Sequence, residues 1–308
     1  MGTGEVFSGL TGMVARPYAI IEAPSTLGLA TDGVERLADR LLKLGLAERI
    51  GARRTARLAV PDKNPVPDPE TGTLNAAAIA DWSPRLADAV EAVLDTGAFP
   101  LVLGGDCTIV LGSMLALRRR GRYGLLFIDG NADFFQPEAE PNGEGASMDL
   151  AFVTGHGPSL LTNIEGRGPL VRSEDTVAFA YRDHADQTEY GSQPLPAALE
   201  VYDLPAIRDI GIDQAAYRAV AHLTRDALDG FFIHLDADVL EDAIMPAVDF
   251  RLPGGLSWEE LAKVLRIALT SGKAVGLEVA IYNPKLDQDG SAGRGLTDLL
   301  AQVLGTET

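Results

Sequence analysis

The 308-residue sequence contains a single cysteine, Cys107, so it cannot form an intrachain disulfide and suits a reducing compartment. Basic residues are also scarce: 26 Lys and Arg face 44 Asp and Glu, which gives a formal net charge of −18. This charge repels phosphate backbones and anionic lipids, so neither nucleic acid nor a membrane surface is expected as a partner. A small or cationic ligand fits the charge better.

Long hydrophobic runs are absent too. No apolar stretch approaches the roughly 18 residues that a bilayer-spanning helix needs. The first twenty residues have neither the basic segment nor the long apolar segment of a secretory leader. Together with the single cysteine, these features predict a cytoplasmic protein.

Short apolar runs alternate with longer segments of helical periodicity, which is the rhythm of an α/β fold with buried parallel strands. The expected strands are 17–22, 99–103, 123–128, 176–181, 230–235 and 274–279, and the expected helices are 33–50, 76–94, 108–119, 213–228, 257–269 and 292–304. Ser257 and Glu260 have the spacing of a capping box. No repeat or low-complexity tract divides the chain, so we expect one domain over residues 1–308.

Acidic residues follow three of the expected strands. They lie in the segments 104–107 (GGDC), 129–133 (DGNAD) and 236–238 (DAD). Side chains alternate along an extended chain, and ligand sites of α/β sheets lie at the carboxyl ends of the strands, so four carboxylates are expected to converge. Two unit charges about 4 Å apart repel by about 4 kcal/mol at an effective dielectric of about 20, a cost that bound divalent cations would offset. A single aspartate after a strand is often only a turn or N-cap residue, but three such segments favour a metal site.

These segments resemble the signatures of the ureohydrolase family of arginase, agmatinase and formimidoylglutamase, which read GGDH, DAHxD and SxDxD. The order and spacing match over roughly residues 17–300. Further matches are the segments 21–24 (IEAP), 181–183 (YRD) and 283–284 (NP) and the Pro- and Gly-rich stretch up to Leu256.

The resemblance implies a three-layer α/β/α sandwich with a mainly parallel sheet and a binuclear Mn²⁺ centre. In this family, the centre activates a bridging hydroxide that attacks a guanidinium or amidine carbon, so the implied activity is metal-dependent hydrolysis of a linear C–N bond. The implied ligands of the first ion are Cys107, Asp129, Asp133 and Asp236, and those of the second are Asn131, Asp129, Asp236 and Asp238. Family members are often trimers or hexamers, so a homo-oligomer is a further expectation.

Two ligand positions depart from the family. Cys107 stands where most members have histidine, which resembles the GGDC branch that includes N-hydroxyarginine hydrolase. A thiolate shifts the preference from Mn²⁺ toward Zn²⁺, Fe²⁺ or Co²⁺, although Cys107 could also be a small buried hydrophobe. Asn131 replaces the histidine of the second motif by an amide, so the second site is expected to be weak or empty unless Asn131 is merely a turn residue.

The proton-transfer and substrate residues are less well defined. Asp149 falls at the place of the family's general acid/base histidine, with His156 as the alternative and Ser147 as a substrate contact. Ile281 replaces the glutamate that grips the guanidinium in arginase; Glu278 could substitute, although it aligns with an earlier structural acid. His234, inside an apolar strand, is expected to be a satisfied core histidine rather than a ligand.

Two functions follow. The first is an amidinohydrolase acting on a small guanidino-type compound. Because the guanidinium anchor is missing, a hydroxyguanidine, another amidine or an amide fits better than arginine. The alternative is a non-catalytic or metal-impaired binding protein on the arginase fold. A different reaction on the same scaffold is a third option.

Overall fold

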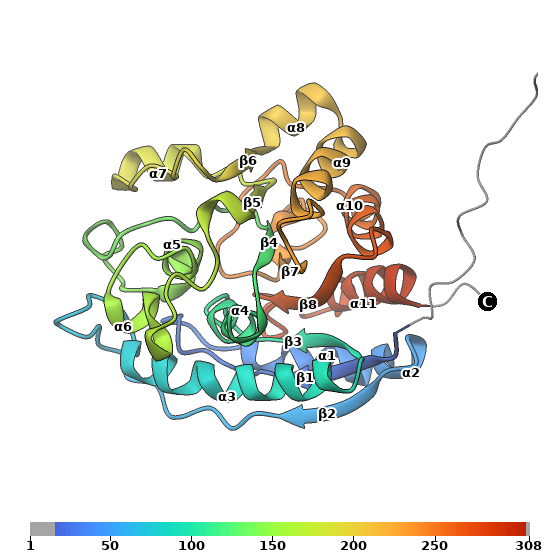
Figure 1. Cartoon of the computed structure of the whole chain (residues 1–308), viewed down its shortest axis with the longest axis horizontal. Coiled ribbons are helices and arrows are strands. Elements are labelled where there is room, and N and C mark those ends of the chain that lie inside the picture. The colour runs from blue at the N-terminus through green and yellow to red at the C-terminus, as the bar shows by residue number, and fades with distance from the viewer. Residues whose placement is uncertain (1–15, 306–308) are drawn as a thin grey trace, which may run out of the picture.

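A central parallel β-sheet organises the protein, whose computed structural model describes residues 16–305. The strands are β1 (Tyr18–Glu22), β2 (Arg53–Arg57), β3 (Phe99–Leu103), β4 (Tyr123–Ile128), β5 (Thr176–Phe179), β6 (Glu200–Tyr202), β7 (Gly230–Asp236) and β8 (Ala274–Ala280). They form one eight-stranded sheet in the order β2-β1-β3-β8-β7-β4-β5-β6, and every neighbouring pair is parallel (Figure 1).

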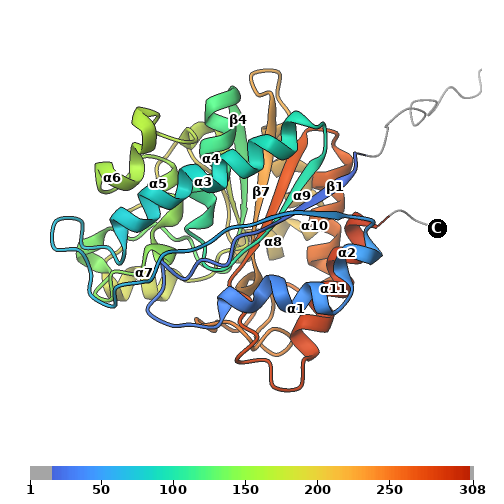
Figure 2. The same ribbon diagram turned by 90° about the horizontal axis from the view of Figure 1, so that it is seen from below.

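Helices cover both faces of the sheet. One layer contains α3 (Ala76–Asp95), α4 (Ile109–Arg120), α5 (Asp149–Val153) and α6 (Ser159–Thr162). The other contains α1 (Leu37–Lys43), α2 (Leu46–Arg49), α8 (Leu204–Ile210), α9 (Ile212–Leu223), α10 (Trp258–Thr270) and α11 (Ser291–Leu304) (Figure 2). The remaining helix, α7 (His184–Tyr190), follows β5. This arrangement confirms the predicted three-layer α/β/α sandwich.

The four central strands are buried along almost their whole length, which explains their apolar sequences. In β3 and β7, for example, every residue is buried. The expected ends of these strands agree with the structure to within one residue. The capping box of Ser257 and Glu260 is confirmed at the start of α10, where each side chain bonds the other residue's backbone N–H.

The sequence-based prediction was wrong in several places. It missed the short helices α5, α6, α7 and α8, and the helix expected over 213–228 ends at Leu223. It missed β2 and β6, because β2 is a mostly exposed, arginine-rich edge strand and β6 has only three residues. It also expected one continuous helix over residues 33–50, whereas the chain forms a short 3₁₀ turn, then α1 and α2, interrupted at Gly45, which has φ 84°. The expected single domain was drawn from residue 1 to 308, and residues 1–15 and 306–308 lie outside the described part.

The strand order brings the chemistry-bearing segments together. Strands β3, β8, β7 and β4 are consecutive in the sheet, so the segments that follow them meet at one edge. The turn after β3 packs closely there: a Cβ at Gly105 would lie 1.8 Å from the carbonyl oxygen of Ser25, so only glycine fits. None of the helices within residues 16–305 combines the length and apolar character needed to cross a bilayer.

Candidate metal centre

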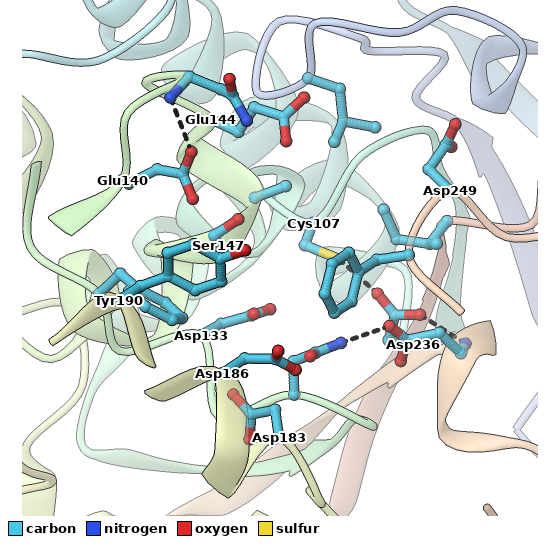
Figure 3. Close-up of a pocket in the computed structure, with 18 of the residues that line it drawn as sticks. Cys107, Asp133, Glu140, Glu144, Ser147, Asp183, Asp186, Tyr190, Asp236 and Asp249 are labelled. Atoms are coloured by element: carbon cyan, nitrogen blue, oxygen red, sulfur yellow. Dashed lines mark hydrogen bonds between the residues drawn. The ribbon is translucent and has the colours of Figure 1, made fainter. Parts of the chain in front are cut away.

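A pocket of about 300 Å³ opens at the carboxyl edge of the central strands (Figure 3). Residues that follow β3, β4, β7 and β8 line it, among them Cys107, Asn131, Asp236 and Ile281. The pocket therefore lies where the sequence predicted that the acidic segments would converge.

The pocket lining is strongly acidic. Eight carboxylate side chains line it, namely Asp133, Glu140, Glu144, Asp183, Asp186, Asp236, Asp238 and Asp249. No lysine, arginine or histidine accompanies them among the described lining residues. Of these eight, Glu140, Glu144, Asp186 and Asp249 were missed by sequence reasoning, because they lie in loops or in the undetected helix α7 and match no motif.

Four buried side chains at the pocket floor could hold one metal ion together. They are Cys107, Asp129, His234 and Asp236, and one donor atom from each lies within 4.8 Å of the others. The Cys107 thiol donates to Asp236 Oδ2 at 2.8 Å. Burial raises the pKa of the Cys107 thiol and of both carboxyls well above their usual ranges, and repulsion between the neighbouring charges adds to the shift.

Unpartnered atoms in this cluster fit a bound cation. Asp129 Oδ2 and His234 Nε2 are buried and have no hydrogen-bond partner. Buried polar atoms are almost always paired, so an orphaned carboxylate oxygen beside an orphaned imidazole nitrogen needs a counterpart. A divalent metal ion supplies one, and the thiol, imidazole and carboxylate donors suit a first-row ion.

Asn131 contacts the acidic cluster through its N–H groups, which leaves only its amide oxygen as a weak metal donor. Its side-chain Nδ2 donates to Asp238 Oδ2 at 2.7 Å, and its backbone N–H donates to Asp129 Oδ1 at 2.7 Å. The backbone N–H of Gly130 donates to the other oxygen of Asp238 at 2.9 Å. Both carboxylate oxygens of Asp238 therefore already have donors.

Asp133 and Asp149 lie beside each other next to this cluster. Asp133 lines the pocket, whereas Asp149 is fully buried, does not line it and has no hydrogen-bond donor on either oxygen. Burial raises the pKa of both carboxyls, and the nearby acidic charges raise them further. Both carboxyls therefore keep their protons to a higher pH than exposed aspartates do.

The other predicted site residues lie at different depths. Ser147 lines the pocket. His156 does not line it; its ring packs against Phe134, and its Nδ1 lies 3.2 Å from Thr154 Oγ1. Glu278 is fully buried and does not line the pocket either, because its carboxylate contacts His234 and Ser113.

His234 is buried, as expected, but it is not a satisfied core histidine. Its Nδ1 lies 2.7 Å from Glu278 Oε1, and its ring stacks on Phe127, while Nε2 has no hydrogen-bond partner. Because the residues around His234 in β7 are apolar, the sequence pattern did not indicate that its Nε2 has no partner. Its cross-strand partner Glu278 is a signal that becomes visible only once the register of β7 and β8 is known.

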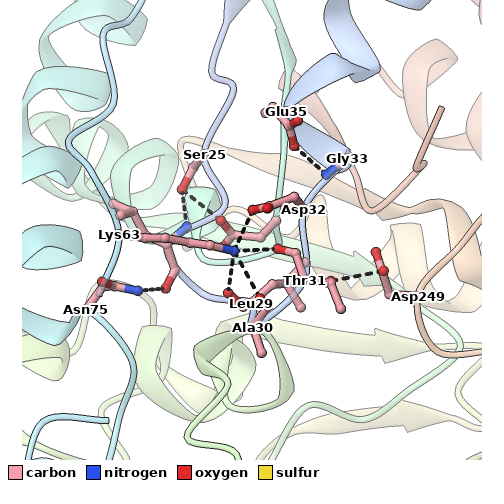
Figure 4. Close-up of polar contacts among 12 residues, drawn as sticks. Ser25, Leu29, Ala30, Thr31, Asp32, Gly33, Glu35, Lys63, Asn75 and Asp249 are labelled. Atoms are coloured by element: carbon pink, nitrogen blue, oxygen red, sulfur yellow. Dashed lines mark hydrogen bonds and ion pairs between the residues drawn. The ribbon is translucent and has the colours of Figure 1, made fainter. Parts of the chain in front are cut away.

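Two basic residues fix the loops around the pocket. Arg182 donates to the carbonyls of Asp238 and Leu252, at 2.9 and 2.7 Å, and so holds the loop after β7. Lys63 donates to the carbonyls of Ala30 and Thr31 and forms an ion pair with Asp32 at 2.6 Å (Figure 4). It thereby secures the loop that carries the lining residues Leu29 and Thr31.

A three-layer α/β/α sandwich with a buried cluster of metal-donor side chains at the carboxyl edge of its sheet is typical of metal-binding α/β proteins. Comparison with known families is more specific, since the family model described as "Arginase family" matches residues 18–307. The chain therefore belongs to the arginase family and is a hydrolase of that family.

Individual relatives agree over nearly the whole chain. An arginase of Bacillus caldovelox is 26% identical over 302 residues, covering 94% of this chain and 98% of the relative. An arginase of Bacillus subtilis strain 168 is 27% identical over 300 residues, with 94% and 98% covered. The native crystal structure of the Bacillus caldovelox arginase superposes with a TM-score of 0.83 at 25% identity, over 95% of this chain and 99% of that one.

Proposed function

We propose that the protein hydrolyses a linear C–N bond in a cationic guanidino-type compound. The acidic pocket above the buried donor cluster carries this proposal, because eight carboxylates and no basic side chain among the described lining residues favour a cation. Membership in the arginase family, whose curated relatives include the arginases named above, supports the same reaction class.

The pocket residues would bind and orient the substrate. The acidic side chains of Asp183, Asp186 and Asp249 would attract the cation. A divalent ion held at the floor would supply the nucleophile by lowering the pKa of water. The family's ion is Mn²⁺, and the thiol of Cys107 among the donors would shift the preference of this chain toward Zn²⁺. Asp149 would exchange a proton with the pocket only by way of Asp133, since Asp149 itself does not line it.

Substrate preference would follow from Ile281. This side chain lines the pocket at the place where the resemblance puts the glutamate that grips a guanidinium. Without that carboxylate, a strongly basic guanidine loses a charge-assisted hydrogen bond, which a less basic hydroxyguanidine needs less. We therefore propose a substrate like that of the GGDC branch of ureohydrolases, in a cytoplasmic protein that forms homo-oligomers.

A second candidate is a metal-impaired binding protein that keeps the pocket but has lost turnover. One observation favours it: Asn131 donates to Asp238, so these two residues satisfy each other instead of presenting two metal donors. The pocket would still bind a small cationic ligand.

A substrate panel separates the two candidates. The full chain, loaded with Mn²⁺ or Zn²⁺, is assayed for urea or substituted-urea release from arginine, agmatine, N-hydroxyarginine and simple amidines. We expect turnover of at least one compound, loss of it in Asp236→Asn, and no change in Asp226→Asn, which removes an exposed acid outside the pocket. Calorimetric binding of a guanidine without any turnover would replace the hydrolase with the binding protein.

A further inference from the structure

We propose that Cys107, Asp129, His234 and Asp236 form a single four-donor metal site in which His234 supplies the nitrogen ligand. This site differs from the binuclear ligand set implied by the resemblance, because it includes His234 and excludes Asn131, Asp133 and Asp238. It concerns metal binding alone and does not depend on which compound, if any, is hydrolysed.

His234 and Asp129 each have a buried acceptor atom with no hydrogen-bond partner. His234 Nε2 lies 3.9 Å from Asp129 Oδ2, which is too long for a hydrogen bond, and both atoms are buried without another partner. Two lone pairs that face each other in a dry interior need a cation between them. The separation is only a few tenths of an ångström longer than the roughly 3.3–3.5 Å that a nitrogen and an oxygen ligand of one tetrahedral ion would have, with arms of about 2.0–2.2 Å.

Glu278 fixes the tautomer of His234. Glu278 Oε1 lies 2.7 Å from Nδ1, and Ser113 Oγ donates to the other oxygen of Glu278 at 2.5 Å. A carboxylate at Nδ1 keeps the proton there and leaves Nε2 free as a ligand. This arrangement of carboxylate and histidine is the usual support behind a metal-binding imidazole.

The geometry of the sheet fixes the orientation of the His234 imidazole. His234 and Asp236 are two residues apart on β7 and therefore share a face of the sheet. On β8, Glu278 is the direct neighbour of His234, and on β4 its neighbour is Phe127, whose ring stacks on the imidazole at a centroid distance of 4.5 Å. The ring is thus clamped between two strands.

The donor set selects the kind of metal. One thiolate, one imidazole and two carboxylates suit tetrahedral Zn²⁺ or Co²⁺ better than Mn²⁺, which prefers oxygen ligands. The four donor atoms lie within 4.8 Å of one another, so small side-chain adjustments suffice to close them around one ion. His234 thus supplies the nitrogen ligand that Asn131 does not provide.

A second proton on His234 is the competing explanation for the two unpartnered atoms. A doubly protonated His234 between Glu278 and Asp129 would satisfy the same atoms without any metal. The two explanations differ in an observable way, because only a ligated imidazole experiences the unpaired electrons of a paramagnetic ion.

Titration of the metal-free full chain with Co²⁺ tests the proposal. We expect binding to saturate at one equivalent of Co²⁺. The optical spectrum should show intense tetrahedral d–d absorption and a thiolate-to-cobalt charge-transfer band from Cys107. The proton NMR spectrum should show one strongly shifted, solvent-exchangeable imidazole N–H resonance. That resonance would belong to Nδ1–H of His234, since it is the histidine of this cluster. The wild-type spectrum needs no variant, so a folding defect cannot confuse it.

Variants then assign the ligands. His234→Gln should abolish the shifted resonance and weaken Co²⁺ binding by more than the roughly 10–100-fold expected for the supporting change Glu278→Gln. Asp238→Asn and the remote control His222→Gln should keep one equivalent and the same spectrum. Two equivalents in the wild type that fall to one in Asp238→Asn, or cobalt bound without a shifted imidazole resonance, would overturn the proposal. Neither result depends on turnover, so failure here is distinguishable from failure of the proposed hydrolase.

Discussion

His234 Nε2 and Asp129 Oδ2 face each other 3.9 Å apart at the floor of the pocket, and neither has a hydrogen-bond partner. The two residues come from neighbouring strands of the sheet, since β7 carries His234 and Asp129 directly follows β4. Two buried acceptor atoms in this arrangement favour a positive charge between them, as the proposed metal site would supply. A metal ion explains the cluster, the orphaned atoms and the carboxylate behind the imidazole together.

Restoring histidine at position 131 should create a second metal site. Asn131→His exchanges an amide that is occupied with Asp238 for an imidazole donor next to three carboxylates. We expect the metal content under excess Mn²⁺ to rise by one ion per chain, measured by elemental analysis after gel filtration. Asn131→Ala is the matched control, because it frees Asp238 without adding a donor. An equal rise in both variants would show that the hydrogen bond, and not the missing donor, limits binding.

Replacing Asp149 by asparagine should stabilise the metal-free protein. Its carboxylate is buried without a donor, and burial raises its pKa, so the ionised form destabilises the folded state. We expect a gain in the free energy of unfolding of about 1–3 kcal/mol at neutral pH in the presence of a chelator.

The raised pKa of Asp149 also determines how the stability gain from Asp149→Asn changes with pH. Because the folded-state pKa lies above the unfolded value of about 3.9, the penalty is absent below that value, grows as the pH rises from there to the folded-state pKa, and stays constant at higher pH. The gain from Asp149→Asn should therefore shrink on acidification. Denaturant unfolding at several pH values measures it, with Asp226→Asn as the exposed control; a gain that does not vary with pH would contradict this explanation.

Introducing a carboxylate at position 281 should shift the substrate preference. Ile281→Glu adds an acceptor to the pocket wall where a basic guanidinium would bind. A charge-assisted hydrogen bond of about 1.5–3 kcal/mol corresponds to a fall in KM of about tenfold or more for arginine or agmatine. Steady-state kinetics on the active substrates measure this effect, and Ile281→Gln, which has the same size without the charge, should show much less. An equal effect of the two variants would point to shape instead of charge.

Removing the Lys63 ammonium should loosen the loop over the pocket. Lys63 is the donor that ties the carbonyls of Ala30 and Thr31 together and pairs with Asp32. Lys63→Met keeps the length of the side chain but loses these bonds, so we expect about 1–2 kcal/mol of lost stability and a KM several-fold higher, with kcat less affected. Lys43→Met, at an exposed position on α1, is the control. An unchanged KM would show that this loop does not shape the pocket.

Much of the architecture was predictable because buried parallel strands have simple apolar sequences. The strands 99–103, 123–128 and 230–235, and the acidic segments that follow them, were found in this way. Strands β2 and β6 were not, since edge strands lack a second buried face and carry no such pattern. The structure also brings Asp129 and Asp236 together, as expected for residues at the ends of neighbouring strands, and places Cys107, which only the resemblance had suggested, beside them.

The remainder of the site depends on contacts that the sequence does not encode locally. Whether His234 is satisfied depends on Glu278, 44 residues further along the chain, and on the register of two strands. The acidic wall formed by Asp186 and Asp249 comes from loops and a short helix, which only tertiary packing places at the pocket. The proton-transfer roles predicted for Asp149 and His156 and the substrate-binding roles predicted for Ser147 and Glu278 remain predictions.

The single four-donor site is best tested by metal competition. The metal-free full chain is equilibrated with equal, excess concentrations of Mn²⁺ and Zn²⁺, and elemental analysis then gives the identity and number of the ions that it retains. We predict one ion per chain, mostly zinc, in the wild type and none retained in His234→Gln. A folded wild-type protein that retains no metal, or one that retains two manganese ions, would contradict the account.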